Sequence, residues 1–159
     1  MNCILFGHRN APSSLRAELK AEILKLIDER GVNRFYIGNN GNFDYLGQCV
    51  LREIVHARAN VNFYIVLSFM GEIALSGEET VTIYPEGLET VPPKFAICKR
   101  NEWLVKNGAF AIVYVESKIS NCYKLMCRAA RRGVHITNLA MKGATSHSKI
   151  AGAIKEKDK

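Results

Sequence analysis

Short apolar runs that stop at a glycine or a proline, each followed by a segment of helical periodicity, most constrain what this chain can fold into. The run at 2–6 stops at Gly7, and the run at 35–37 stops at Gly38. Uninterrupted apolar runs of this length are typical of strands that are buried on both faces. We expect further strands at about 62–69, 81–84, 110–115 and 135–139.

The segments between these runs carry apolar residues at the spacing of one helix face. In the first of them, Ser13 or Ser14 can cap a helix that Gly31 ends. We expect further helices over about 46–57, 95–105 and 121–132, and a surface loop at 71–79. Strand and helix therefore alternate along most of the chain.

This alternation predicts the fold class. Parallel neighbours in a sheet need crossover connections, and such crossovers are right-handed. We therefore expect an α/β fold, namely a doubly wound, Rossmann-like, mostly parallel sheet with helices on both faces. At 159 residues the chain fits one such domain, which we place at 1–141. Residues 142–159 lose periodicity and gain lysine, which predicts a basic, flexible tail.

The balance of charge narrows the class of partner. The formal net charge is +7, which favours an anionic partner such as a nucleotide, a nucleic acid or an acidic surface. The chain has no run of about 18 apolar residues, and it begins without a basic region followed by a long apolar segment. We therefore expect a cytoplasmic protein with no membrane partner.

Cysteine and histidine spacing offers no metal pattern. The five cysteines are odd in number and include no Cys-x-x-Cys pair. His56, His135 and His147 have no metal-like spacing with each other or with a cysteine. The sequence thus predicts neither a disulfide framework nor a metal site, and it identifies no cofactor.

Three segments directly follow predicted strands and should share the rim of the sheet at which ligands of such folds bind. They are Gly7-His8-Arg9, 38–44 and 116–121. Arg9 can pair with a phosphate or a carboxylate, while His8 can donate a hydrogen bond or move a proton. The alternative is that Arg9 makes a structural ion pair and His8 is a surface turn residue.

The loop at 38–44 carries glycines and leads into a predicted helix. Glycine lets a backbone approach a phosphate closely, and a helix N-terminus offers N–H groups and a positive dipole end. The loop matches neither G-x-x-x-x-G-K-[ST] nor G-x-G-x-x-G. An ordinary turn with an N-capping aspartate is the alternative. The candidate ligand-binding residues of this loop are Gly38, Asn39, Asn40, Gly41 and Asp44.

Two further segments place charged side chains near the same rim. Glu86 and Glu89 are candidate catalytic residues, because an acid beside a sugar phosphate can hold ribose hydroxyls or act as a general acid or base. Their alternative is to be solvated surface residues. Arg100 and Asn101 begin a predicted helix and are candidate ligand-binding residues, whereas Trp103 on the same helix is expected to be a core anchor.

Four motifs occur together between residues 3 and 139: Phe6-Gly-His-Arg9, Phe35-Tyr-Ile-Gly-Asn-Asn-Gly-Asn-Phe-Asp44, Ile83-Tyr-Pro-Glu-Gly-Leu-Glu89 and Arg100-Asn-Glu-Trp103. This combination resembles the bacterial branch of the SLOG superfamily, which groups Rossmann-like proteins with the DNA-processing protein of natural transformation and the Lonely Guy phosphoribohydrolases. The resemblance implies a pocket formed by the loops after the first, second and later strands, with a nucleotide or nucleotide-derived ligand. The residues that match its first two loops are Gly7, Arg9, Gly38, Asn39, Gly41 and Asp44.

Two departures from the family pattern limit what the resemblance implies. The Lonely Guy enzymes carry a P-G-G-x-G-T-x-x-E stretch that supplies a phosphate loop and a catalytic acid, and nothing in this chain matches it. Close relatives usually show a Gly-Gly pair after the strand equivalent to 110–115, where this chain has Lys118-Ile-Ser-Asn-Cys122. A phosphate would approach that part of the pocket less closely.

Three functions follow as hypotheses. The first is binding or sensing of a nucleotide or an ADP-ribose-like small molecule, with its phosphates at 38–44 and Arg9 as the counter-charge. The second is a hydrolase that cleaves an N-glycosidic or phosphoester bond, with Glu86 or Glu89 as the acid or base. The third is single-stranded nucleic-acid binding that uses the basic tail. We also expect a homodimer, since Rossmann-like domains commonly associate through helix faces.

Overall fold

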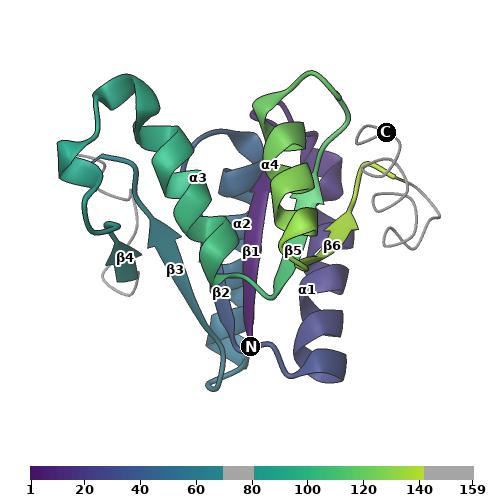
Figure 1. The fold of residues 1–159 in the computed structure, drawn as a ribbon. Coiled ribbons are helices and arrows are strands. Elements are labelled where there is room, and N and C mark those ends of the chain that lie inside the picture. The colour runs from purple at the N-terminus through teal and green to yellow at the C-terminus, as the bar shows by residue number, and fades with distance from the viewer. Residues whose placement is uncertain (70–80, 142–159) are drawn as a thin grey trace.

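The computed structural model describes residues 1–69 and 81–141. Within these ranges, parallel strands alternate with helices in the order expected (Figure 1). The loop expected at 71–79 and the tail expected at 142–159 lie outside the described residues. The strands are β1 (Asn2–Gly7), β2 (Arg34–Ile37), β3 (Asn62–Val66), β4 (Val81–Ile83), β5 (Phe110–Tyr114) and β6 (His135–Asn138). The α-helices are α1 (Arg16–Arg30), α2 (Asn42–Ala57), α3 (Ala96–Asn107) and α4 (Asn121–Arg131).

The six strands form one sheet in the order β4-β3-β2-β1-β5-β6, and every pairing is parallel. Strand order therefore runs outward from β1 in both directions, first through β2 to β4 and then through β5 to β6. In register, Leu5 of β1 lies opposite Ile37 of β2 and Ile112 of β5. This confirms the predicted α/β, Rossmann-like, doubly wound sheet, and the described sheet is wholly parallel.

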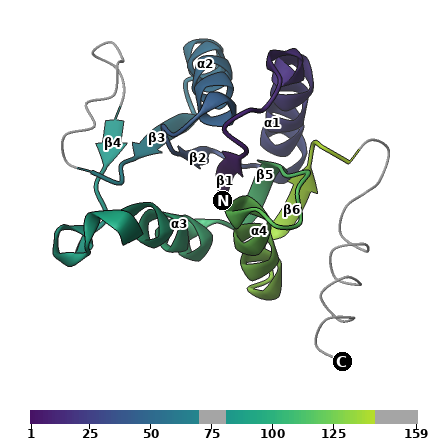
Figure 2. The same ribbon diagram turned by 90° about the horizontal axis from the view of Figure 1, so that it is seen from above.

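Helices cover both faces of the sheet. Seen along the sheet from above, α1 and α2 lie on one face, and α3 and α4 lie on the other (Figure 2). Right-handed crossovers produce this arrangement because the direction of winding reverses after β4, when the chain returns to pair β5 with β1. The reversal places a switch point between β1 and β5.

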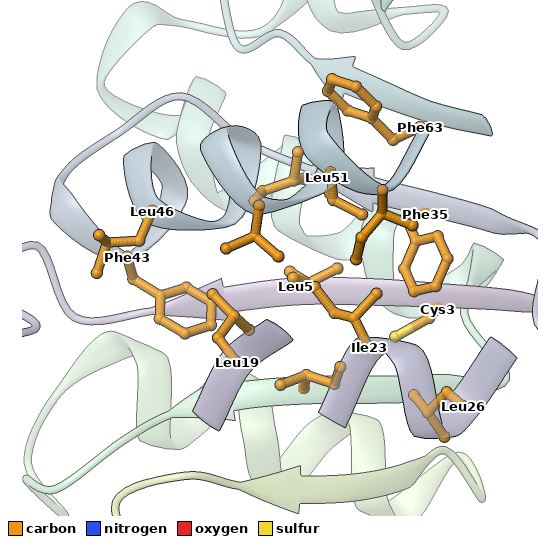
Figure 3. Close-up of a cluster of buried hydrophobic side chains, with 14 of the residues drawn as sticks. Cys3, Leu5, Leu19, Ile23, Leu26, Phe35, Phe43, Leu46, Leu51 and Phe63 are labelled. Atoms are coloured by element: carbon orange, nitrogen blue, oxygen red, sulfur yellow. The ribbon is translucent and has the colours of Figure 1, made fainter. Parts of the chain in front are cut away.

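Each face of the sheet has its own buried cluster. Cys3 and Leu5 of β1 point to the α1/α2 side, whereas Ile4 and Phe6 point to the α3/α4 side. Figure 3 shows the cluster under α1 and α2, where the side chains of both helices close over β1 and β2. Burial on both faces explains why the sequence of β1 reads as an unbroken apolar run.

The helix ends differ in part from their expected form. Gly31 ends α1 in the left-handed conformation, with φ of 67°, as predicted. The prediction that Ser13 or Ser14 caps α1 is wrong. Both serines belong to a 3₁₀ turn (Ser13–Leu15), and neither side chain caps a helix. The 3₁₀ turns Leu88–Thr90 and Pro93–Phe95 likewise precede α3. Among the described residues, no helix has the length and apolar character needed to cross a bilayer.

Candidate functional site

A cavity of about 430 Å³ opens at the carboxyl ends of the strands, beside the switch point between β1 and β5. We call it the switch-point cavity. Its walls come from the ends of β1 and β2, the start of α2, one side of α3 and the first turns of α4. A volume of several hundred Å³ at this position of a doubly wound sheet is typical of small-molecule sites.

The loop that follows β1 is anchored to the loop that follows β5 through His8. The backbone N–H of His8 donates to the carbonyl of Tyr114 at 3.1 Å, and its ring Nε2 accepts from the backbone N–H groups of Glu116 at 2.9 Å and Ser117 at 3.3 Å. Because a backbone N–H can only donate, Nε2 is the acceptor and the neutral ring carries its proton on Nδ1. In this structure His8 positions the mouth of the cavity.

The loops after β1 and β2 are joined to each other at Gly41. This glycine has φ of 109°, and a Cβ there would come within 2.6 Å of the Cα of Arg9. Next to it, the N–H of Asn42 donates to the carbonyl of Arg9 at 2.9 Å, and its side chain donates to the carbonyl of Ala11. Glycine is thus required at 41 both by conformation and by the close approach of the neighbouring loop.

Gly38 makes room for protein groups of the site. A Cβ at this position would overlap the guanidinium of Arg100 and come 2.9 Å from Oδ2 of Asp44. Arg100 reaches this point from α3 and donates to the carbonyl of Val66, at the end of β3, at 3.4 Å. The absence of a side chain at 38 therefore allows a cation from the opposite side of the sheet to lie across the end of β2.

Asp44 and Arg100 form a buried, oppositely charged pair of residues in the cavity wall. Only 6% of the surface of Asp44 and 4% of the surface of Arg100 is exposed to solvent. Oδ2 of Asp44 accepts from the backbone N–H of Asn40 at 2.9 Å, and Nε of Arg100 donates to Oδ1 of Asn101 at 3.0 Å. Burial raises the pKa of Asp44 to about 6, opposed by the positive charge of Arg100, the hydrogen bond from Asn40 and the charge of Arg9.

The carboxylate of Asp44 occupies the start of α2. The helix begins at Asn42 with Gly41 as its N-cap, so Asp44 lies in the first turn and is not the N-cap. Its side chain reaches back to the N–H of Asn40, one residue before the N-cap, whereas the acidic residue of a capping box accepts from the N-cap itself. The positive end of this helix is therefore already faced by a negative charge from the protein itself.

The N-terminus of α4 forms the opposite wall and carries no such carboxylate. Ser120 is the N-cap, and its Oγ accepts from the N–H of Tyr123 at 3.1 Å. Asn121 and Cys122 line the cavity at the first turn, where backbone N–H groups have no intrahelical acceptor. Burial, together with the charge of Asp44, raises the pKa of the Cys122 thiol, so the thiol form is favoured.

Sequence reasoning missed the apolar wall of the cavity. Phe6 of β1, Ile97 and Leu104 of α3 and Leu125 of α4 line it together. Helical periodicity marks such residues as buried, but it does not distinguish a side chain that packs against the sheet from one that borders a cavity. Asn138 was also missed: its buried side chain donates to the carbonyl of Val115 at 2.9 Å and accepts from the N–H of Val115 at 3.1 Å, and so holds the end of β5.

The structure brings most of the predicted ligand-binding residues together. Those that line the switch-point cavity are Gly7, His8, Arg9, Gly38, Asn40, Asp44, Arg100 and Asn101. Asn39 and Gly41 belong to the same loop but are not part of the lining. Oδ1 of Asn39 and Nδ2 of Asn40 are buried and have no hydrogen-bond partner among the described residues. Buried polar atoms of this kind often bond to water or to a ligand.

Glu86 and Glu89 do not reach the switch-point cavity. Glu86 lines a separate hollow of about 300 Å³ that lies between the segment 85–91 and α3, and Glu89 lines neither cavity. Both side chains belong to exposed residues. Among the described residues, no group of three or more His, Cys, Asp and Glu side chains is arranged to hold a metal ion.

The fold and the cavity define a Rossmann-like α/β protein with a ligand-sized cavity at its switch point. No family model and no curated protein matches the chain. The likeness to the SLOG superfamily therefore stays a prediction from the motifs, and the function has to be argued from the site.

Proposed function

We propose that the switch-point cavity binds a nucleotide or a nucleotide-derived small molecule, such as an ADP-ribose derivative, and that the protein acts as a binding or sensing module. The observation that carries this proposal is the composition of the cavity. One wall is apolar, with Phe6, Ile97, Leu104 and Leu125, and the other is polar and positively charged. A nucleotide has the same division between an apolar base and a charged phosphate.

The two helix N-termini at the cavity are not equivalent as phosphate sites. A phosphate at the start of α2 would lie against the Asp44 carboxylate, which already accepts the N–H of Asn40. The start of α4 has no acidic residue in its first turn. Arg100 and Arg9 both lower the pKa of Cys122 in that turn, and so oppose the charge of Asp44, which also reaches it. We therefore place the phosphate at 120–122 beside Arg9, and not at 38–44 as the sequence predicted.

In this proposal Asp44 binds the ribose of the nucleotide, and the apolar wall of the cavity binds its base. An acceptor carboxylate at the carboxyl edge of the sheet is suited to the hydroxyl groups of a ribose. The apolar side chains between α3 and α4 can cover the faces of a base. In this arrangement the ligand extends from the start of α4, across the end of β1, toward Asp44.

Binding is better supported than hydrolysis. Neither Glu86 nor Glu89 lines the cavity, so neither is placed to act on a ligand bound there. The titratable side chains that do line it are His8, Arg9, Asp44, Arg100 and Cys122. His8 is held as a hydrogen-bond acceptor for the backbone of the β5–α4 loop, which leaves its Nε2 unavailable as a general base.

A ligand screen with matched variants tests the proposal. Nucleotides, dinucleotides, cyclic nucleotides and ADP-ribose derivatives are added in a thermal-shift assay, where a ligand at 100 times its Kd adds about 2.7 kcal/mol. For the best compound, Arg9→Ala should weaken binding roughly 10- to 100-fold, since charged hydrogen bonds contribute about 1.5–3 kcal/mol. Arg30→Ala removes an exposed arginine at the end of α1 and should have no effect.

Two results would reject the nucleotide site. One is that no compound of these classes raises the Tm, and the other is that the best compound binds Arg9→Ala and Arg30→Ala equally well. Turnover of the same compound is then measured with wild type and Glu86→Gln. Turnover that Glu86→Gln abolishes would favour the hydrolase in place of the binding module.

A further inference from the structure

The helices on the two faces of the sheet differ in how their charges are compensated. Helix α1 carries four basic and four acidic residues. Two of its cations, Arg16 and Lys20, pair with Glu53 of α2, and its Asp28 pairs with Arg58, the C-cap of α2, at 2.7 Å. The charges of the α1/α2 face therefore largely neutralise one another within the protein.

The α3/α4 face is basic and lacks this compensation. Helix α4 has no acidic residue, and the only acidic residue of α3 is Glu102. We define the basic face as the exposed cations of these helices and of the α4 C-cap: Lys99, Lys106, Lys124, Arg128, Arg131 and Arg132. Glu102 pairs with two of them, Lys99 at 3.2 Å and Arg128 at 3.6 Å. The other four have no ion-pair partner among the described residues.

The basic face is continuous across the two helices. Glu102 of α3 lies within ion-pair distance of Arg128 of α4, so the two rows of cations are neighbours. The first and last cations are seven residues apart in α3 and eight apart in α4 with its C-cap, which is about 10–12 Å of helix. α3 and α4 lie on the same face of the sheet (Figure 2). A polyanion laid across this face meets several cations at once.

A hollow with an aromatic wall borders the basic face. It is the 300 Å³ hollow already described, lined by Lys99, Glu102, Trp103 and Lys106 of α3 and by the segment 85–91, which includes Glu86. The rings of Trp103 and Tyr36 pack edge to face, with their centroids 5.2 Å apart and the planes at 89°. The indole is only partly buried, so it is both a core contact and part of the wall of this hollow.

We infer that the basic face binds single-stranded nucleic acid, with phosphates on the exposed cations and an unstacked base in the Trp103 hollow. Cations that follow the backbone, together with an aromatic surface for a base, are what sequence-independent single-strand binders have in common. A duplex keeps its bases stacked and presents none to such a hollow. A membrane surface is less suitable, because the apolar residues of α4, Leu125, Met126 and Ala129, are buried against the sheet.

The test uses the full chain and a fluorescein-labelled oligothymidine of about 12 nucleotides, a length within the range of such sites. Anisotropy gives the affinity of wild type, of Arg131→Glu/Arg132→Glu, and of Lys25→Glu/Arg30→Glu as the control. Both double variants change the net charge equally and leave residues 142–159 intact, but the control changes α1. The basic-face variant should bind at least tenfold more weakly than the control.

Salt dependence and tryptophan fluorescence complete the test. With about four phosphates contacted, wild-type affinity should fall roughly 50-fold between 50 and 200 mM salt. Trp103 is the only tryptophan, so saturation with oligonucleotide should change its emission, and Trp103→Phe should weaken binding while keeping an aromatic ring against Tyr36.

Several outcomes overturn the inference. They are an absence of binding by wild type at 50 mM salt, equal losses in the two double variants, and unchanged Trp103 emission at saturation. Tighter binding to a duplex of the same length, or to vesicles that contain anionic lipid, overturns the choice of partner. None of the changed residues lines the switch-point cavity, so this test and the nucleotide screen fail independently.

Discussion

The two faces of the sheet are built from the same strands, yet they differ in packing and charge. The α1/α2 face is closed by large side chains that are fully buried, such as Leu19 and Ile23, and several of its surface charges form ion pairs. The α3/α4 face contains a cavity, the buried cation Arg100 and an excess of exposed cations. The comparison indicates that one face chiefly stabilises the fold, whereas the other leaves space and charge for partners.

Removing a core leucine from each face measures this difference most directly. Leu19 on α1 is fully buried, and Leu19→Ala should lower the free energy of unfolding by about 3–4 kcal/mol, since it leaves an enclosed cavity. Leu125 on α4 already borders a cavity, so Leu125→Ala should cost less, about 2 kcal/mol, at the low end of the range for buried leucines. Urea denaturation of both variants gives the two values. Equal costs would show that the two faces do not differ in packing.

The pH dependence of stability should reveal the buried carboxylate of α2 that faces Arg100 of the α3/α4 face. The pKa of Asp44 is raised from 3.8 to about 6 in the folded protein. Below pH 4 both states hold the proton, and no stability is lost. Between pH 4 and 6 the unfolded state has lost its proton while the folded state still holds it, so stability falls by up to about 3 kcal/mol and levels off above pH 6, where both states are ionised.

Asp44→Asn isolates this effect from all other titrating groups. The difference in the free energy of unfolding between wild type and Asp44→Asn should move against wild type between pH 4 and 7. The variant also leaves Arg100 without its acidic neighbour, but that cost is nearly constant over this range and does not alter the slope. A difference that is flat with pH, measured by urea denaturation at each pH, would contradict a buried carboxylate with a raised pKa.

The smallest expected effect concerns the mouth of the cavity. His8→Ala removes the acceptor for the N–H groups of Glu116 and Ser117, both of which belong to exposed residues. Water can replace that acceptor, so the loss of stability should be about 1 kcal/mol or less. Hydrogen exchange should nevertheless become faster at 116–120, while α1 keeps wild-type protection. Unchanged exchange in this loop would mean that His8 does not anchor it.

The sequence was a good guide to the elements and a weaker guide to the contacts between them. The strands are apolar on both faces and the helices on one, so both kinds of element show in the pattern of apolar residues. Gly7, Gly31 and Gly38 then mark where β1, α1 and β2 end. The first turn of α1 was harder to predict. Ser13 and Ser14 suit an N-cap, but the 3₁₀ turn that precedes the helix places neither side chain where it can accept a capping hydrogen bond.

For the site, sequence reasoning found the loops but not all of their roles. Gly38 and Gly41 were interpreted as glycines that admit a phosphate, whereas in the structure they admit Arg100 and the backbone of Arg9. The partners come from distant parts of the chain, and no local pattern indicates which side chain will fill the space above a glycine. The apolar wall of the cavity depends on how α3 and α4 pack, which the sequence of one helix does not contain.

The contact between Arg9 and Gly41 has a consequence for how such a site can diversify. The atoms that join the two loops are the carbonyl and the first carbons of residue 9, while the charged group lies at the other end of its side chain. Substitutions that keep an unbranched side chain preserve the joint and replace only the group presented to the ligand. Substitutions at position 9 can therefore change ligand preference during evolution without changing the loop contact that holds the site together.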